Sequence, residues 1–108
     1  MLPTYCSFDA MAESVALSCY WDAAESDAGE ALFDLVYARL THCIVGIAPW
    51  SGPTSYGDAV ARRRSTSMIG SSQGETEIGL VLIEAPASDL VPARRYLSLS
   101  IARDFEDE

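Results

Sequence analysis

The stretch RRRSTSMIGSSQGETEIG, residues 62–79, gathers the residue types best suited to bind a phosphate group. Arginines, serines and glycines together offer guanidinium, hydroxyl and backbone N–H donors. A phosphate cradle also needs glycines that open a helix, so that free N–H groups and the helix dipole face the anion. Gly70, Gly74 and Gly79 instead lie between two alternating apolar runs. This placement is typical of a β-hairpin, and we predict one here.

Charged residues on the two sides of this hairpin are expected to pair across the strands. The arginines precede the tip and the glutamates follow it; the set is Arg62, Arg63, Arg64, Glu75, Glu77 and Glu84. Ion pairs on the solvated face of a hairpin contribute about 0.2–1 kcal/mol each. The glutamates near the tip would also repel a phosphate. The stretch is therefore predicted to be structural.

Side chains able to carry catalysis are few. The sequence has no lysine, which excludes a P-loop lysine and a Schiff-base lysine, and His42 is the only histidine. His42 and Cys43 are neighbours, and because neighbours in a strand point to opposite faces, we expect them not to act as base and nucleophile. Carboxylate pairs such as Asp22 with Glu25 would bind a cation only if further oxygens converged on them. We predict no enzyme activity, no cofactor and no metal.

The cysteines are Cys6, Cys19 and Cys43, an odd number without the C-x-x-C spacing of redox or zinc motifs. We expect reduced, mostly buried thiols in a cytoplasmic protein. Asp9 and Glu13 interrupt the apolar character of the N-terminal segment, which argues against an export signal. No window has the ~18 uninterrupted apolar residues of a membrane span.

Length and charge narrow the class of protein. With 108 residues and 49% hydrophobic residues, the chain is predicted to form one domain over residues 1–108, with a frayed acidic tail at 104–108. The formal net charge is −9, which repels nucleic-acid phosphates and anionic lipid. It suits a partner protein with a basic surface, or it serves solubility alone.

The first half of the chain is predicted to contain one strand and the main helix. Alternating apolar residues favour a strand at 13–21, with a helix starting near Asp9 as the competing interpretation. Residues 26–42 predict an amphipathic helix with Asp27 as N-cap and Glu30 at the third helical position. Its apolar stripe, expected to be core, consists of Leu32, Phe33, Leu35, Val36 and Leu40.

The second half is predicted to be mainly strands. Residues 43–50 indicate a short buried strand, 51–57 a loop, and 54–64 one or two helical turns capped by Ser55 with Asp58 three residues later. Three strands follow at 65–71, 76–85 and 94–105, as an antiparallel meander. The fold class is thus α+β: a β-α-β start, then strands, with one helix packed on a mostly antiparallel sheet of four to five strands.

These observations favour binding over catalysis. The first hypothesis is an acidic inhibitor of a protein with a basic, nucleic-acid-handling surface, of the kind represented by immunity proteins, antitoxins and phage anti-defence (anti-CRISPR-like) proteins. The residues expected to face the partner are Trp50, Tyr56, Glu75, Glu77, Asp104, Glu106, Asp107 and Glu108. A second hypothesis is a self-associating structural or viral accessory subunit, which dimerises through an uncovered last strand. A third is a small enzyme whose site a partner completes.

Overall fold

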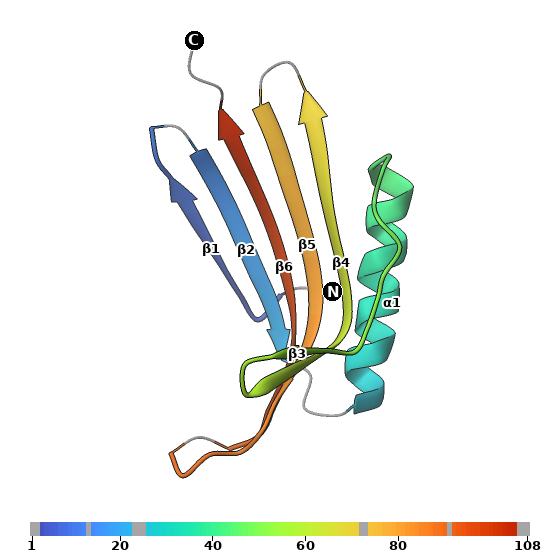
Figure 1. The fold of residues 1–108 in the computed structure, drawn as a ribbon, viewed down its shortest axis with the longest axis vertical. Helices are drawn as coiled ribbons and strands as arrows, with labels where there is room; N and C mark the ends of the chain where they lie inside the picture. The colour runs from blue at the N-terminus through green and yellow to red at the C-terminus, as the bar shows by residue number, and fades with distance from the viewer. Residues whose placement is uncertain (1–2, 13, 23–25, 72–73, 91, 106–108) are drawn as a thin grey trace.

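The computed structural model describes residues 3–12, 14–22, 26–71, 74–90 and 92–105. In these ranges one helix packs on a six-stranded antiparallel sheet, which confirms the predicted α+β class but adds strands to the predicted four to five. Figure 1 shows the curved sheet with the helix beside it. The elements are β1 (Tyr5–Ala10), β2 (Ser14–Asp22), α1 (Ser26–Cys43), β3 (Thr54–Tyr56), β4 (Ala59–Ser71), β5 (Gly74–Ala85) and β6 (Arg94–Phe105).

The strand order is β1-β2-β6-β5-β4-β3. The predicted hairpin and meander are confirmed, because β4, β5 and β6 are consecutive neighbours in the sheet (Figure 1). The last strand is not an edge, however: β6 lies between β2 and β5, so it cannot pair with a second copy as expected. Asp104 and Phe105 are the last two residues of β6, so the strand extends into the segment predicted as a tail.

Two strands were not predicted. β1 forms a hairpin with β2, in which Phe8 lies opposite Leu17, so the competing helix near Asp9 is wrong. β3 and the first residues of β4 replace the helical turns predicted at 54–64. Gly57, with a φ of 64°, turns the chain between these strands, and pairing of Ser55 with Val60 outweighs the local capping signal. The start of the chain is therefore β-β-α.

Helix α1 confirms the prediction at 26–42 and ends one residue later. Its stripe packs on the sheet through Phe33 and Val36, which are buried, while Leu35 is 43% exposed and lies outside the core. Asp27, the predicted N-cap, is the second residue of α1, and its side chain lies outside the described part of the structure; the Glu30 carboxylate accepts a hydrogen bond from Arg63.

The core lies between α1 and the centre of the sheet. Phe33, Leu80 and Leu97 are its largest fully buried side chains, and Trp21 and Leu82 extend it. Burying an apolar side chain of this size stabilises the fold by about 1.5–3 kcal/mol. Because the helix contacts β5 and β6, the core forms on one face of the sheet.

Residues 43–50 do not form the predicted strand. Cys43 ends the helix, and the chain turns at Gly46, whose φ is 93°. The backbone of Ala48 is then held by side chains: Tyr37 and Ser65 donate hydrogen bonds to its carbonyl, and its N–H donates to Ser67 Oγ at 2.6 Å. These hydrogen bonds from side-chain hydroxyls take the place of the backbone hydrogen bonds that a strand would form. They also explain why two serines are buried in β4.

Arg63 contacts both α1 and the segment between α1 and β3, residues 44–53, which we call the connection. Its guanidinium lies 4.3 Å from the ring centre of Phe33 and 4.0 Å from that of Trp50. It also donates hydrogen bonds to the carboxylates of Glu30 and Asp34 on α1. The side chain is only 12% exposed. One cation on β4 therefore binds two rings and two carboxylates from two other segments of the chain.

Cys6 and Cys19 form a disulfide across directly paired positions of β1 and β2. The expectation of reduced, mostly buried thiols is therefore wrong, and the remaining cysteine, Cys43, is exposed. The spacing gave no signal, because 13 residues separate the two cysteines and only the strand register brings them together. The disulfide fixes the edge strand β1 to the sheet.

The Arg63 contacts predict a specific loss of stability. Arg63→Lys should lower the free energy of unfolding by about 1–2 kcal/mol, because an ammonium group cannot stack between two rings and bind two carboxylates at once. The control is Arg64→Lys, the next residue, which turns to the other side of the sheet and should change stability by less than about 0.5 kcal/mol. Urea unfolding measures both. Equal losses would contradict this role of Arg63.

The disulfide predicts a second loss. The double variant Cys6→Ala, Cys19→Ala should unfold with a free energy about 2–3 kcal/mol lower, since the loop closed by the bond is short. Cys43→Ala, at an exposed position, should be nearly neutral. Titration of the denatured, unreduced protein should find one free thiol. Three free thiols would show that the bond does not form.

Candidate functional site

The strand register decides which residues of the 62–79 stretch share a face of the sheet. Arg63, Ser65 and Ser67 face α1, where their side chains bind helix and connection. Arg64 and Thr66 alternate with them and so lie on the opposite face, which we call the open face. The donors of the stretch are divided between two sides of the sheet. They form no phosphate cradle.

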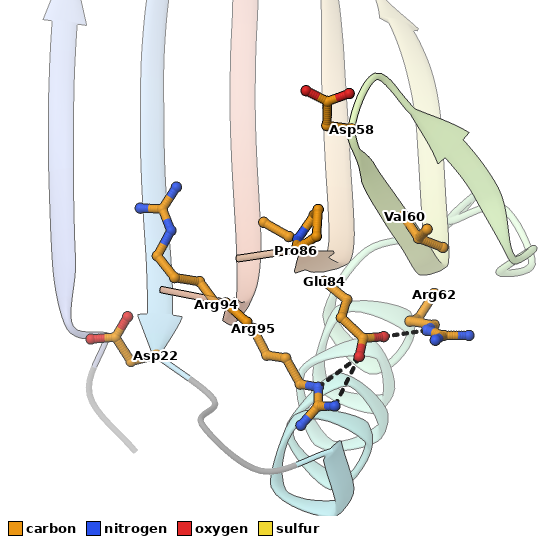
Figure 2. Close-up of a pocket in the computed structure, with 10 residues that line it drawn as sticks. Asp22, Asp58, Val60, Arg62, Glu84, Pro86, Arg94 and Arg95 are labelled. Atoms are coloured by element: carbon orange, nitrogen blue, oxygen red, sulfur yellow. Dashed lines mark hydrogen bonds and ion pairs between the residues drawn. The ribbon is translucent and has the colours of Figure 1, made fainter. Parts of the chain in front are cut away.

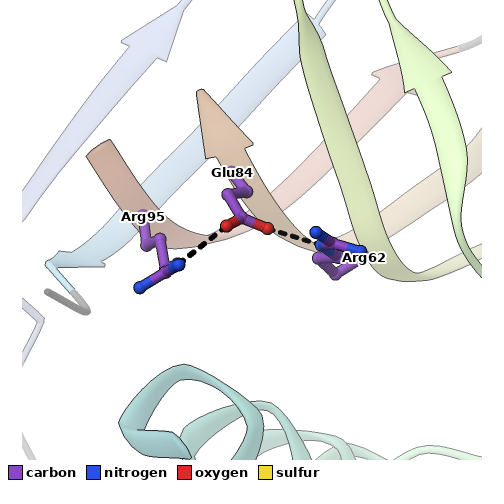
Figure 3. A network of polar contacts seen from close by, with 3 residues as sticks. All are labelled: Arg62, Glu84 and Arg95. Atoms are coloured by element: carbon purple, nitrogen blue, oxygen red, sulfur yellow. Dashed lines mark hydrogen bonds and ion pairs between the residues drawn. The ribbon is translucent and has the colours of Figure 1, made fainter. Parts of the chain in front are cut away.

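A bulge in β4 lets two consecutive arginines, Arg62 and Arg63, point to the same side of the sheet. The register shifts between Ala61 and Arg63, so Arg62 is an extra residue that reaches Glu84 on β5. The Glu84 carboxylate binds Arg62 through one oxygen and Arg95 of β6 through the other, at 2.8 Å from Arg95 Nη2 (Figure 3). We call these three residues the arginine corner. Of the cross-strand ion pairs expected between the hairpin arginines and glutamates, the described residues show only the one between Arg62 and Glu84, whereas Arg63 pairs with the helix.

A cavity of about 630 Å³ lies beside the arginine corner. Figure 2 shows that its side chains come from β4, from the ends of β2, β5 and β6, and from the turn between β3 and β4. Its charged lining residues are Asp22, Asp58, Arg62, Glu84, Arg94 and Arg95. Three cations and three carboxylates balance, so the lining of this cavity carries no net charge.

The open face has a flat centre of small residues. One row across five strands runs through Ser7, Ser18, Ser100, Gly79 and Thr66. A Cβ added at Gly79 would lie 3.1 Å from Ser100 Oγ, so the row has no room for a larger side chain without a shift. In the described ranges no helix covers this face, because α1 packs on the other side.

One end of the open face is acidic. Its four carboxylates are all exposed and share the same side in the strand register: Asp9, Glu75, Glu77 and Asp104. Glu75 lies directly opposite Asp104, an arrangement of like charges that destabilises a sheet. Among the described residues, no ion pair neutralises any of these four carboxylates. We call this set the acidic end.

The other end of the open face carries three tyrosines, which we call the tyrosine corner: Tyr5, Tyr20 and Tyr96. The ring centres of Tyr5 and Tyr20 are 5.6 Å apart, and those of Tyr20 and Tyr96 are 6.4 Å apart. Tyr5 is 57% and Tyr20 37% exposed. Together with Asp22 and Arg94 they line a second cavity of about 410 Å³.

The partner-binding residues predicted from the sequence are only partly gathered. Glu75, Glu77 and Asp104 meet at the acidic end. Trp50 lies on the helix side and packs its ring on Arg63 and Phe33, although 47% of it is exposed. Tyr56 is in β3, and its side chain is outside the described part of the structure. Glu106, Asp107 and Glu108 also lie outside the described residues.

Sequence reasoning missed the tyrosine corner and Asp9. Tyr20 and Tyr96 were visible as members of alternating strands, but the pairing of β1 with β2 and of β2 with β6 was not predictable from local pattern. The alternation of polar residues in 94–105 was the available signal. It marked a solvated face without showing what lies beside it.

The residues with catalytic potential stay apart or exposed. His42 is in the last turn of α1 and is exposed, as is Cys43. Since both are helical, neither belongs to a strand. Across the described ranges, no three His, Cys, Asp or Glu side chains converge as a metal site would require. No helix in those ranges has the length and apolar character to cross a membrane.

Comparisons of the chain with protein-family models, with curated proteins and with solved structures find no match. The functional argument therefore depends on the faces, charges and cavities of this structure.

The arginine corner predicts a pH dependence of stability. Hydrogen bonds from Arg62 and then Arg95 hold the pKa of Glu84 below its ordinary value of 4.5. Because the folded-state pKa is lowered, this stabilisation is complete above pH 4.5 and is lost as the pH falls through the folded-state pKa. Glu84→Gln should cost about 0.5–1 kcal/mol at pH 7. The cost should shrink in acid.

Urea unfolding of wild type and variant at pH 7 and pH 3 measures this difference. Glu77→Gln is the matched control, since it changes an exposed glutamate of the same strand in the acidic end. Removing that charge relieves repulsion and should leave stability equal or slightly higher. A Glu84→Gln cost that is the same at both pH values would contradict the ionic role of Glu84.

Proposed function

We propose that this chain is a non-enzymatic, acidic binding protein that covers and inhibits a basic, nucleic-acid-handling surface of a partner protein. The role is the one that immunity proteins, antitoxins and phage anti-defence (anti-CRISPR-like) proteins fill. The observation that carries the proposal is the acidic end of the open face. Four exposed carboxylates share this end of the face and none of them forms an ion pair among the described residues; two of them lie directly opposite each other.

Repulsion between Glu75 and Asp104 lowers the stability of the free protein. A partner that supplies lysine or arginine side chains would turn this repulsion into attraction, which is the pattern of electrostatic complementarity. The flat row of small residues beside the acidic end supports the same proposal, since it lets another surface approach the sheet closely. The net charge of −9 adds long-range attraction to a basic body.

The prediction of a cytoplasmic location depended on reduced cysteines. Cys6 and Cys19 form a disulfide, a bond typical of oxidising compartments, so the cysteines no longer support that location. Location stays a prediction. The proposal does not depend on it, as the open face is present wherever the folded chain is.

Partner capture followed by charge variants tests the proposal. A protein captured by cross-linking in the native host should be basic, lose its activity on nucleic acid when bound, and dissociate as salt rises from 50 to 500 mM. Glu75→Gln with Asp104→Asn should weaken binding by about tenfold or more. Asp89→Asn, an exposed acid in the connection between β5 and β6, is the matched control and should change binding little.

Two outcomes would contradict the proposal. The first is binding that is insensitive to salt and to the paired variant. The second is a native mass that shows a stable oligomer with no affinity for basic proteins, which would favour the self-associating subunit.

A further inference from the structure

The cavity at the tyrosine corner has the composition of a site for a cationic side chain. Three aromatic rings, from Tyr5, Tyr20 and Tyr96, line about 410 Å³ of space together with the Asp22 carboxylate and the side chain of Arg94. The face of an aromatic ring is electronegative and attracts a guanidinium or ammonium group within about 6 Å of its centre. A carboxylate beside the rings adds a charged acceptor.

The arrangement of the rings leaves their surfaces accessible. Tyr5 and Tyr20 are tilted by 43°, and Tyr20 and Tyr96 meet edge to face at 74°, so the three rings are not stacked into one closed block. Tyr5 and Tyr20 also remain substantially exposed. Exposed tyrosines that line a cavity are typical anchoring residues of protein interfaces.

The chain already places one cation at this corner. The guanidinium of Arg94 lies 5.9 Å from the ring centre of Tyr96. Arg94 extends away from Arg95, toward β2, whereas Arg95 pairs with Glu84 in the arginine corner (Figure 2). The face of Tyr96 is thus suited to a guanidinium. A positive charge at Arg94 would, however, repel a second cation.

We propose that the tyrosine corner binds an arginine side chain of the partner protein. The inference rests on the proposed function and adds to it the group that the partner inserts. Arginine fits better than lysine, because its planar guanidinium can stack on a tyrosine ring while its edge donates two hydrogen bonds to Asp22. The acidic end, at the far side of the open face, would attract the basic body from which this arginine projects.

The test uses N-acetyl-arginine methylamide as the probe and its neutral analogue N-acetyl-citrulline methylamide as the control. Nuclear magnetic resonance titration should give saturable shifts at Tyr5, Tyr20 and Tyr96 with the arginine probe and weaker or no shifts with citrulline. N-acetyl-lysine methylamide should bind more weakly than arginine. Equal shifts with arginine and citrulline would overturn the proposal, since they would indicate packing without charge recognition.

Variants separate this site from a merely exposed aromatic patch. Tyr20→Leu should abolish the saturable shifts, and Asp22→Asn should weaken binding about fivefold, whereas Asp89→Asn should not change it. Circular dichroism checks that each variant is folded; if Tyr20→Leu is not, Tyr5→Leu replaces it. Binding that survives both the tyrosine and the Asp22 changes would overturn the proposal.

Arg94→Gln gives the sharpest outcome. Removing its positive charge should strengthen binding of the arginine probe about fivefold, the opposite of what loss of a structural residue would do. Weaker binding in this variant, or tighter binding of N-acetyl-glutamate methylamide to wild type, would assign the corner to an anion instead. The salt-sensitive binding of a partner to the acidic end is measured in a separate experiment. If the arginine probe does not bind the tyrosine corner, that experiment still tests the proposed function.

Discussion

The contacts of Arg63 hold the helix and the connection against the sheet, and the arrangement of the fold depends on them. A single guanidinium stacks between Phe33 of the helix and Trp50 of the connection, while Glu30 and Asp34 accept its hydrogen bonds. Arginine is costly to bury unless its charge is paired, and here the Glu30 and Asp34 carboxylates pair the charge through Nη1 while two rings cover the guanidinium, although the buried Nε has no hydrogen-bond partner among the described residues. The bulge before Arg63 makes this possible, because it turns Arg63 toward the helix after Arg62 has reached Glu84.

The consequence is an asymmetric molecule. The helix, the connection and the main core cluster lie on one side of the sheet, so in the described ranges no helix covers the opposite face. The four carboxylates of the acidic end then share that face with the tyrosine corner. A sheet that can be solvated on one side tolerates such a face, since its backbone hydrogen bonds are made within the sheet. The side chains of the open face are therefore available to contact a partner.

Local pattern was sufficient for the elements whose own residues determine them. The apolar spacing of residues 32–40 predicted α1, and alternation predicted β2, β5 and β6. It failed where distant residues decide: Ala48 is held by hydroxyls of β4, and Cys6 meets Cys19 only through the β1–β2 register. The candidate site divides in the same way. Glu75, Glu77 and Asp104 were identified from their charge, but Asp9 and the tyrosine corner require three strands to pair correctly.

The two ends of the open face differ in the range of the forces they exert. Carboxylates at the acidic end act over about a Debye length, roughly 8–10 Å at physiological salt, and therefore govern the approach of a charged partner. The tyrosine corner acts only on contact, through ring faces and the Asp22 carboxylate, and therefore governs how long a complex lasts. Because they lie at opposite ends of one sheet, a partner that engages both has a fixed orientation. Mutations at the acidic end should consequently alter association, and mutations at the tyrosine corner dissociation.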